Sequence, residues 1–84
     1  MPQQPEFAVR VESSPGHRGE LVPTRLSLGG APIEVVEVVD AWLAPDHRYF
    51  KVRGSDGACY ILRNDVISGR WQLTVYDSVG FRRW

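Results

Sequence analysis

The sequence has few cysteines and no long hydrophobic run. Cys59 is its only cysteine, so no disulfide can form within the chain and no multi-cysteine zinc site is available. This cysteine usage is typical of a reducing compartment, and we expect a cytoplasmic protein. No apolar stretch approaches the roughly 20 residues of a membrane span, and no signal-peptide pattern is present, so we expect neither membrane association nor secretion.

Net charge is absent as well, because ten Lys and Arg residues balance ten Asp and Glu residues. Dedicated duplex-DNA binders are strongly basic, so this balance argues against that class. The balance conceals an asymmetry: residues 1–46 contain three basic and seven acidic side chains, and residues 47–84 contain seven and three. Two interpretations stay open, which are charge pairing across neighbouring strands and a charged side that is used in binding.

Helical periodicity is the third absence, and alternation of apolar and polar residues takes its place. Five segments have strand-like patterns of apolar and β-branched residues, 24–28, 33–43, 48–53, 58–64 and 71–76, with Gly, Pro or Asp between the segments. The sequence therefore predicts an all-β protein with a single curled antiparallel five-stranded sheet or a small SH3-like barrel. We expect a flexible arm over residues 1–20 with one short edge strand, a β domain over 21–78 and a tail over 79–84.

Two local features refine this prediction. Glu34 and Glu37 cannot share a face of an uninterrupted strand, so we expect a bulge near Val35-Val36. The Asp56-Gly57 pair predicts a hairpin between the strands at 48–53 and 58–64. Its register stays open, because a two-residue loop places Val52 opposite Ile61 and a three-residue loop starting at Ser55 places it opposite Tyr60.

Residues that carry chemistry are present but not in catalytic patterns. His17 lies in the predicted arm and His47 in a turn, and Asp46 next to His47 should point away from it along the strand. Cys59 is expected to be a small buried hydrophobe. The carboxylates of the long strand should form a solvated face: Glu34, Glu37 and Asp40. We therefore expect no enzyme, no catalytic or metal-binding residue, no cofactor and no small-molecule substrate.

Aromatic residues interleaved with basic ones give the strongest binding signal. Side chains of this kind in a small β domain can stack on bases and meet phosphates, or anchor a protein partner. The candidate binding residues are Tyr49, Lys51 and Arg53 on one strand face, Arg63 on the next strand, and Arg82, Arg83 and Trp84 at the end of the chain. The alternative is that Phe50, Tyr60 and Trp71 are core residues and the arginines keep the sheet soluble. The final residues could cover an open end of the sheet or form a free peptide.

A resemblance adds to this interpretation. Its motif consists of Tyr49–Arg53, Asp56-Gly57, Tyr60, Leu62-Arg63, Asp65, Ser68–Trp71 and Leu73. Over residues 23–77 the chain resembles a family of small bacterial domains of unknown function. That family is similar in turn to the C-terminal domain of Y-family polymerase homologues in error-prone damage tolerance. The chain departs from the pattern at 27–31, where an aromatic residue is missing before the first turn.

The predicted function combines these observations. The resemblance implies an accessory role in bacterial DNA repair or lesion bypass, and the basic and aromatic residues imply binding. We expect a non-enzymatic docking module for a protein partner. The alternative is a small β-barrel that binds single-stranded nucleic acid.

Overall fold

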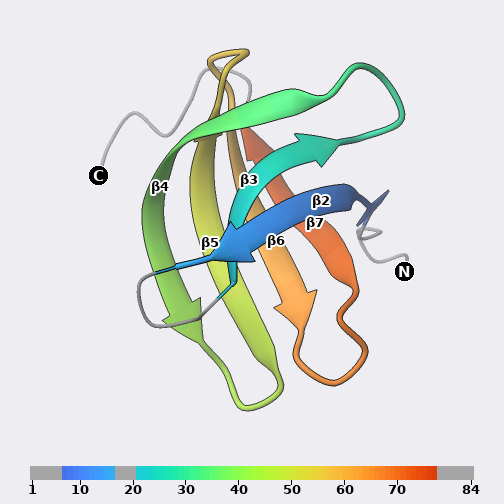
Figure 1. The fold of residues 1–84 in the computed structure, drawn as a ribbon, viewed down its shortest axis with the longest axis vertical. Helices are drawn as coiled ribbons and strands as arrows, with labels where there is room; N and C mark the ends of the chain where they lie inside the picture. Colours follow the sequence, from blue (N-terminus) through green and yellow to red (C-terminus); the bar gives the residue numbers. More distant parts are fainter. Residues whose placement is uncertain (1–6, 17–20, 78–84) are drawn as a thin grey trace, which may run out of the picture.

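A computed structural model of the chain describes residues 7–16 and 21–77 and shows one curled antiparallel sheet (Figure 1). No helix occurs in these residues. The strands are β1 (Phe7–Ala8), β2 (Arg10–Pro15), β3 (Leu21–Ser27), β4 (Ile33–Leu43), β5 (His47–Gly54), β6 (Cys59–Asp65) and β7 (Trp71–Asp77). The all-β prediction is confirmed, and the five predicted segments correspond to β3–β7.

The N-terminal residues add a further strand to the five. β1 and β2 form one strand that is interrupted at Val9, and the order of the sheet is β1-β7-β6-β5-β4-β3-β2. β1 pairs with β7 and β2 pairs with β3, so one chain segment connects both ends of the curled sheet. The short edge strand predicted within residues 1–20 is therefore present as β1 and β2, and it is part of the sheet. Residues 1–6 of the predicted arm and its residues 17–20 lie outside the described residues.

β4 is the strand that curls the sheet. Its register against β5 shifts at Val36 and again at Val39, and β4 bends sharply there in Figure 1. The first shift confirms the predicted bulge near Val35-Val36, and an extra residue in one strand is a common cause of such a bend. The first residues of β4, Ile33 and Glu34, pair with β3, and the rest of β4 pairs with β5 alone among the described strands.

The β5–β6 hairpin adopts the second of the two registers considered. Val52 lies opposite Tyr60, and the Gly54 amide donates to the Ala58 carbonyl at 2.9 Å, which leaves a three-residue loop. Gly57 has a φ of 87°, the left-handed conformation that glycine adopts at little cost. The Asp56 carboxylate accepts a hydrogen bond from the Ala58 amide and so closes the loop.

The core lies on the concave face of the curled sheet. The buried cluster consists of Leu26, Phe50, Val52, Ala58, Tyr60, Leu62 and Leu73. The partly buried residues Val9, Val11, Ile33, Val35 and Trp71 pack against it. Phe50 and Tyr60 are therefore core residues, as one of the two sequence interpretations held, and Trp71 lies at the margin of the core.

Candidate functional site

A row of four side chains crosses the convex face of the sheet from β4 to β7. The register places Trp42 opposite Tyr49, Tyr49 opposite Arg63, and Arg63 opposite Gln72. The rings of Trp42 and Tyr49 are stacked, with centroids 5.3 Å apart and an interplanar angle of 2°. Arg63 donates from Nε and Nη2 to Gln72 Oε1 at 3.1 and 2.5 Å. We call these four residues the aromatic row.

The other two predicted cations of this face are less available than the sequence suggested. Lys51 shares the face of Tyr49 and Arg53, but its side chain is only 8% exposed. Arg53 forms an ion pair with Glu37, which lies opposite it on β4. Asp40 lies opposite Lys51 in the same way. Acidic side chains of β4 thus lie opposite basic side chains of β5 on this face, and the Arg53–Glu37 pair joins the acidic and basic halves of the chain.

The predicted C-terminal contributors Arg82, Arg83 and Trp84 lie outside the described residues. Of the predicted binding residues, the structure brings together Tyr49 and Arg63. It adds Trp42, which the sequence analysis did not select. A signal for Trp42 was present in the Ala44-Pro45-Asp46 turn, because a hairpin at this turn places the last residues of β4 opposite the first residues of β5.

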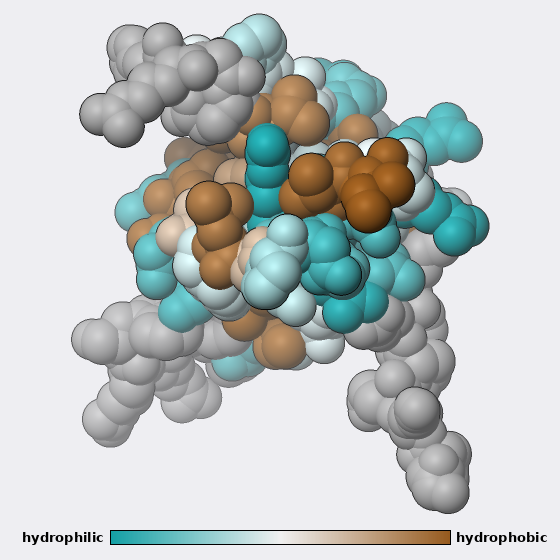
Figure 2. All heavy atoms as spheres, turned by 90° about the horizontal axis from the view of Figure 1, so that it is seen from below, coloured by the Kyte–Doolittle hydropathy of each residue, from teal (hydrophilic) through white to brown (hydrophobic). Residues whose placement is uncertain are grey.

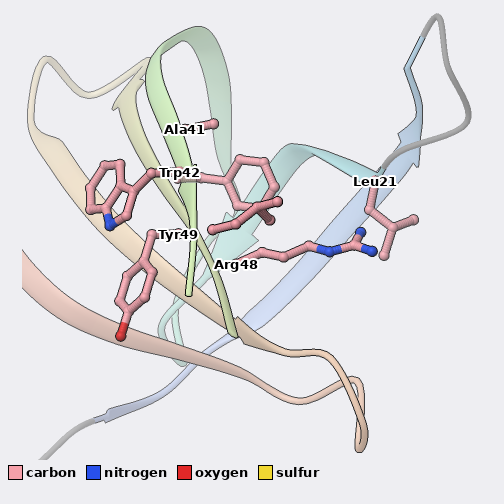
Figure 3. A pocket seen from close by; sticks show the side chains of 7 residues that line it. Leu21, Ala41, Trp42, Arg48 and Tyr49 are labelled. Atoms are coloured by element: carbon pink, nitrogen blue, oxygen red, sulfur yellow. The ribbon is translucent and has the colours of Figure 1, made fainter. Parts of the chain in front are cut away.

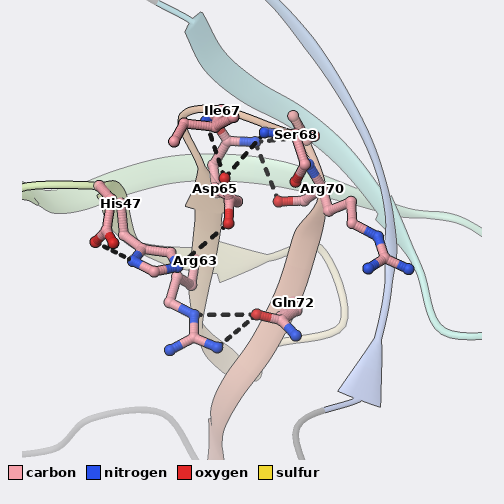
Figure 4. A network of polar contacts seen from close by, with 10 residues as sticks. His47, Arg63, Asp65, Ile67, Ser68, Arg70 and Gln72 are labelled. Carbon is pink, nitrogen blue, oxygen red and sulfur yellow. Dashed lines mark hydrogen bonds and ion pairs between the residues drawn. The ribbon is translucent and has the colours of Figure 1, made fainter.

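Beside the aromatic row, polar contacts connect the β4–β5 turn with the β6–β7 turn (Figure 4). His47 Nδ1 lies 2.8 Å from Asp46 Oδ1, and His47 Nε2 lies 3.7 Å from Asp65 Oδ2. The Val66 amide donates to the Asp46 carbonyl at 3.0 Å. The expectation that Asp46 and His47 point apart is wrong, because Asp46 precedes the strand and its turn conformation lets the carboxylate face the ring.

Asp65 holds the β6–β7 turn in shape. Its Oδ1 accepts hydrogen bonds from the backbone amides of Ile67 and Ser68, both at 2.9 Å. Donation by the Ser68 amide is the main reason why the pKa of the Asp65 carboxyl is lowered, and the Ile67 amide and the His47 ring add to it. The described residues contain no group of three or more His, Cys, Asp or Glu side chains arranged to hold a metal ion.

Large apolar side chains are exposed at the end of the sheet where these two turns meet. Leu43 is 77% exposed and Ile67 is 88% exposed, and Val66 and Leu21 are also exposed. Figure 2 looks at the molecule from this side and shows hydrophobic side chains in several groups with hydrophilic ones between them. We call Leu21, Leu43, Val66 and Ile67 the apolar end.

A hollow of about 270 Å³ opens next to Leu43, between β3 and the β4–β5 hairpin (Figure 3). It is lined by Leu21, Ala41, Trp42, Leu43, Arg48, Tyr49 and Phe50. Trp42 and Tyr49 point to one side of the hairpin, and Arg48 points to the other side, toward Leu21 (Figure 3). The side chain of Arg48 makes no hydrogen bond or ion pair with any described residue. The hollow does not include His47 or either of the carboxylates next to it.

No helix in the described residues has the length and apolar character needed to span a bilayer. Comparison of the chain with protein-family models, with curated proteins and with solved structures gave no match. The resemblance to small bacterial domains of unknown function therefore stays a prediction.

Proposed function

We propose that this protein is a docking module that binds a protein partner through its apolar end and the adjoining Trp42–Tyr49 stack. The observation that carries the proposal is the exposure of Leu43, at the end of β4, and of Ile67, in the β6–β7 turn, which are 77% and 88% exposed. The turn that follows Leu43 lies beside the β6–β7 turn. Scattered apolar residues are normal on protein surfaces, whereas a group of large ones at one place is typical of an interaction site.

The two turns next to these side chains are held by hydrogen bonds within the protein itself. The hydrogen bond from the Val66 amide to the Asp46 carbonyl joins them, and the Asp65 carboxylate accepts hydrogen bonds from the amides of Ile67 and Ser68. A surface that is already ordered loses little conformational entropy on binding, which favours affinity. The stacked rings of Trp42 and Tyr49 add rigid aromatic area of the kind found at binding hot spots.

Charge favours a protein partner over single-stranded nucleic acid. A nucleic-acid face needs several cations that can reach phosphates. On the convex face Lys51 is buried, Arg53 is paired with Glu37, and Asp40 lies close by. Arg63, the cation beside the aromatic rings, donates to Gln72.

A photo-crosslinking amino acid at position 43 tests the docking proposal in cells. We expect a discrete crosslinked protein that disappears when Ile67 is changed to Glu. The matched control is the same label at Leu28, which is 42% exposed and follows the other end of β3. Identical products from both positions, or no product from position 43, would contradict the proposal.

Salt dependence tests the nucleic-acid alternative. We expect a labelled single-stranded oligothymidine to remain unbound in about 50 mM salt at protein concentrations up to ~100 µM. Binding that weakens steeply and log-linearly with salt, and that is lost in Arg63→Gln, would favour that alternative instead.

The accessory role in bacterial DNA repair or lesion bypass is supported only by the resemblance described for residues 23–77. It predicts that the protein crosslinked at position 43 belongs to the damage-tolerance machinery. A partner from an unrelated metabolic process would contradict this part of the proposal and leave the docking role in place.

A further inference from the structure

The hollow beside the apolar end combines three features that together suit an extended peptide. These are an apolar lining, an arginine whose side chain pairs with no described residue, and a strand edge that no described strand covers. The inference from them rests on the proposed docking function and specifies the chemistry of the partner.

The strand edge belongs to β4. β3 and β4 pair only at Arg25–Glu34 and Leu26–Ile33, and from Val35 onward β4 is paired on one side alone, with β5. β3 and β4 diverge toward Leu21 and Leu43, and the hollow lies in the space between them. Within the described residues, no strand pairs with this side of β4 near Ala41 to Leu43. The Ala41 amide there donates to the Asp40 carboxylate at 2.8 Å, so a further strand can pair most readily at Leu43.

The hollow next to this edge accepts an apolar side chain. Leu21, Leu43 and Phe50 contribute apolar surface, and the volume of about 270 Å³ is below the ~300–1,000 Å³ of pockets that enclose whole small molecules. It suits a single large side chain of a peptide. In a strand paired with β4, alternate side chains would point to the same side as Leu43, Arg48 and Phe50, which line the hollow.

Arg48 supplies a positive charge, which selects the residue of the peptide that lies next to the inserted apolar side chain. It lies opposite Leu43 on β5, its side chain reaches toward Leu21, and it pairs with no carboxylate of the described chain. Arg25 and Arg53, by contrast, each have an acidic partner on an adjacent strand. A guanidinium beside an apolar hollow is suited to a carboxylate, which it can bind with two parallel hydrogen bonds.

We propose that an extended segment of the partner pairs with the free edge of β4, inserts a large apolar side chain between Leu21, Leu43 and Phe50, and places an adjoining carboxylate on Arg48. The segment thus carries an apolar residue close to an Asp, a Glu or its own C-terminal carboxylate. In strand addition of this kind, backbone hydrogen bonds provide affinity, and the fit of a side chain in the hollow provides specificity.

The test is selection of twelve-residue peptides from a random display library with the full chain. We expect enrichment of sequences that combine Leu, Ile, Met or Phe with a nearby acidic residue. In Arg48→Met, which keeps the apolar stem and removes the charge, the acidic preference should disappear while the apolar preference stays. Affinity of the selected peptides should fall at least tenfold, which corresponds to about 1.4 kcal/mol.

Arg10→Met is the matched control, because Arg10 is an exposed arginine that lies opposite Ser27, at the other end of β3 from Leu21. It should leave selection unchanged. Methylation of alternate backbone nitrogens in a selected peptide should abolish binding in one of the two alternations only, since a paired strand turns every second amide toward its neighbour.

Three results would overturn the inference: no enriched motif, a motif that Arg48→Met leaves unchanged, or sedimentation showing that a second copy of this chain occupies the edge. If position 43 still crosslinks a partner in these cases, the docking role stands and only the peptide chemistry is wrong. If position 43 crosslinks nothing while peptides bind as expected, the apolar end is not the docking surface used in cells.

Discussion

Tyr60 shows how a single polar atom is accommodated in a core of this size. Its side chain is 1% exposed, and its hydroxyl group forms a hydrogen bond with the Asp56 carboxylate in the hairpin loop. Burial raises the pKa of Tyr60 well above its usual range, and the hydrogen bond and negative charge of Asp56 raise it further. The folded protein therefore holds this proton more tightly than the unfolded chain does.

This difference predicts a specific loss of stability at high pH. An unfolded tyrosine releases its proton near pH 10, so the free energy of unfolding should fall above that pH by at most about 1.4 kcal/mol per pH unit from this residue. Tyr60→Phe should reduce the slope. Urea unfolding of both proteins between pH 9 and 11 measures it, and equal slopes would show that Tyr60 ionises equally in both states.

Lys51 illustrates what the sequence could not reveal at the scale of residues. Alternation correctly placed it on the face of Tyr49 and Arg53, because a strand has a period of two. It did not show that this side chain is buried, because burial depends on the neighbouring strands across the convex face. His47 is a similar case, since its contact with Asp65 depends on a register that spans β5 and β6.

At the scale of elements, the end of β5 is shaped by the contact of three strands at Gly54. A Cβ atom at Gly54 would lie 2.7 Å from Ile33 Cγ2 on β4, 2.7 Å from Asp56 Oδ1 and 3.1 Å from Tyr60 Cε1 on β6. The bend of β4 brings Ile33 this close. Glycine is therefore required here for space, whereas Gly57 in the next turn is required for its positive φ.

We expect Gly54→Ala to lower the free energy of unfolding by about 1–3 kcal/mol, because neighbouring side chains must shift. Gly30→Ala is the control, since a Cβ there meets no atom within 4 Å and Gly30 has no positive φ. Chemical denaturation of both variants measures the difference. Equal stability of the two would mean that β4 and the hairpin loop relax without cost.

The elements themselves were largely predictable. Turn residues and alternation located β4, β5, β6 and β7 to within one residue at each end, and the charged positions Glu34 and Glu37 indicated the first bulge. The second bulge, at Val39, had the same kind of signal, because Glu37 and Asp40 are also three residues apart and cannot share a face of an uninterrupted strand, but the prediction did not use it. β3 begins at Leu21, three residues before the predicted start. Proline has no backbone N–H, but Pro23 can occupy a strand position at which no N–H needs to donate to a neighbouring strand.

At the scale of the whole molecule, the N-terminal strand decides how the sheet is completed. Val9 and Val11 pack against the core, and Val11 lies opposite the buried Leu26. Because the same strand pairs with β3 and with β7, its residues support both ends of the sheet. A domain of this size has few other contacts to compensate for a loss there.

Val11→Ala should accordingly cost about 1–2 kcal/mol of unfolding free energy, through lost apolar contacts with the core. Ser14→Ala on the same strand should change it by less than about 0.5 kcal/mol, because Ser14 is exposed. Thermal and urea unfolding give both values. Equal effects would mean that β2 is peripheral to the fold.

The sequence by itself determined the all-β class, the five strands β3–β7, the hairpin at Asp56-Gly57 and the face on which Tyr49 lies, because strand periodicity and turn chemistry are local. Only the tertiary structure decided between the two hairpin registers, joined β1 and β2 to opposite ends of the sheet, stacked Trp42 on Tyr49 and left Arg48 beside an apolar hollow. These features depend on register and curvature summed over several strands, and side chains far apart in the sequence become neighbours only after both are set.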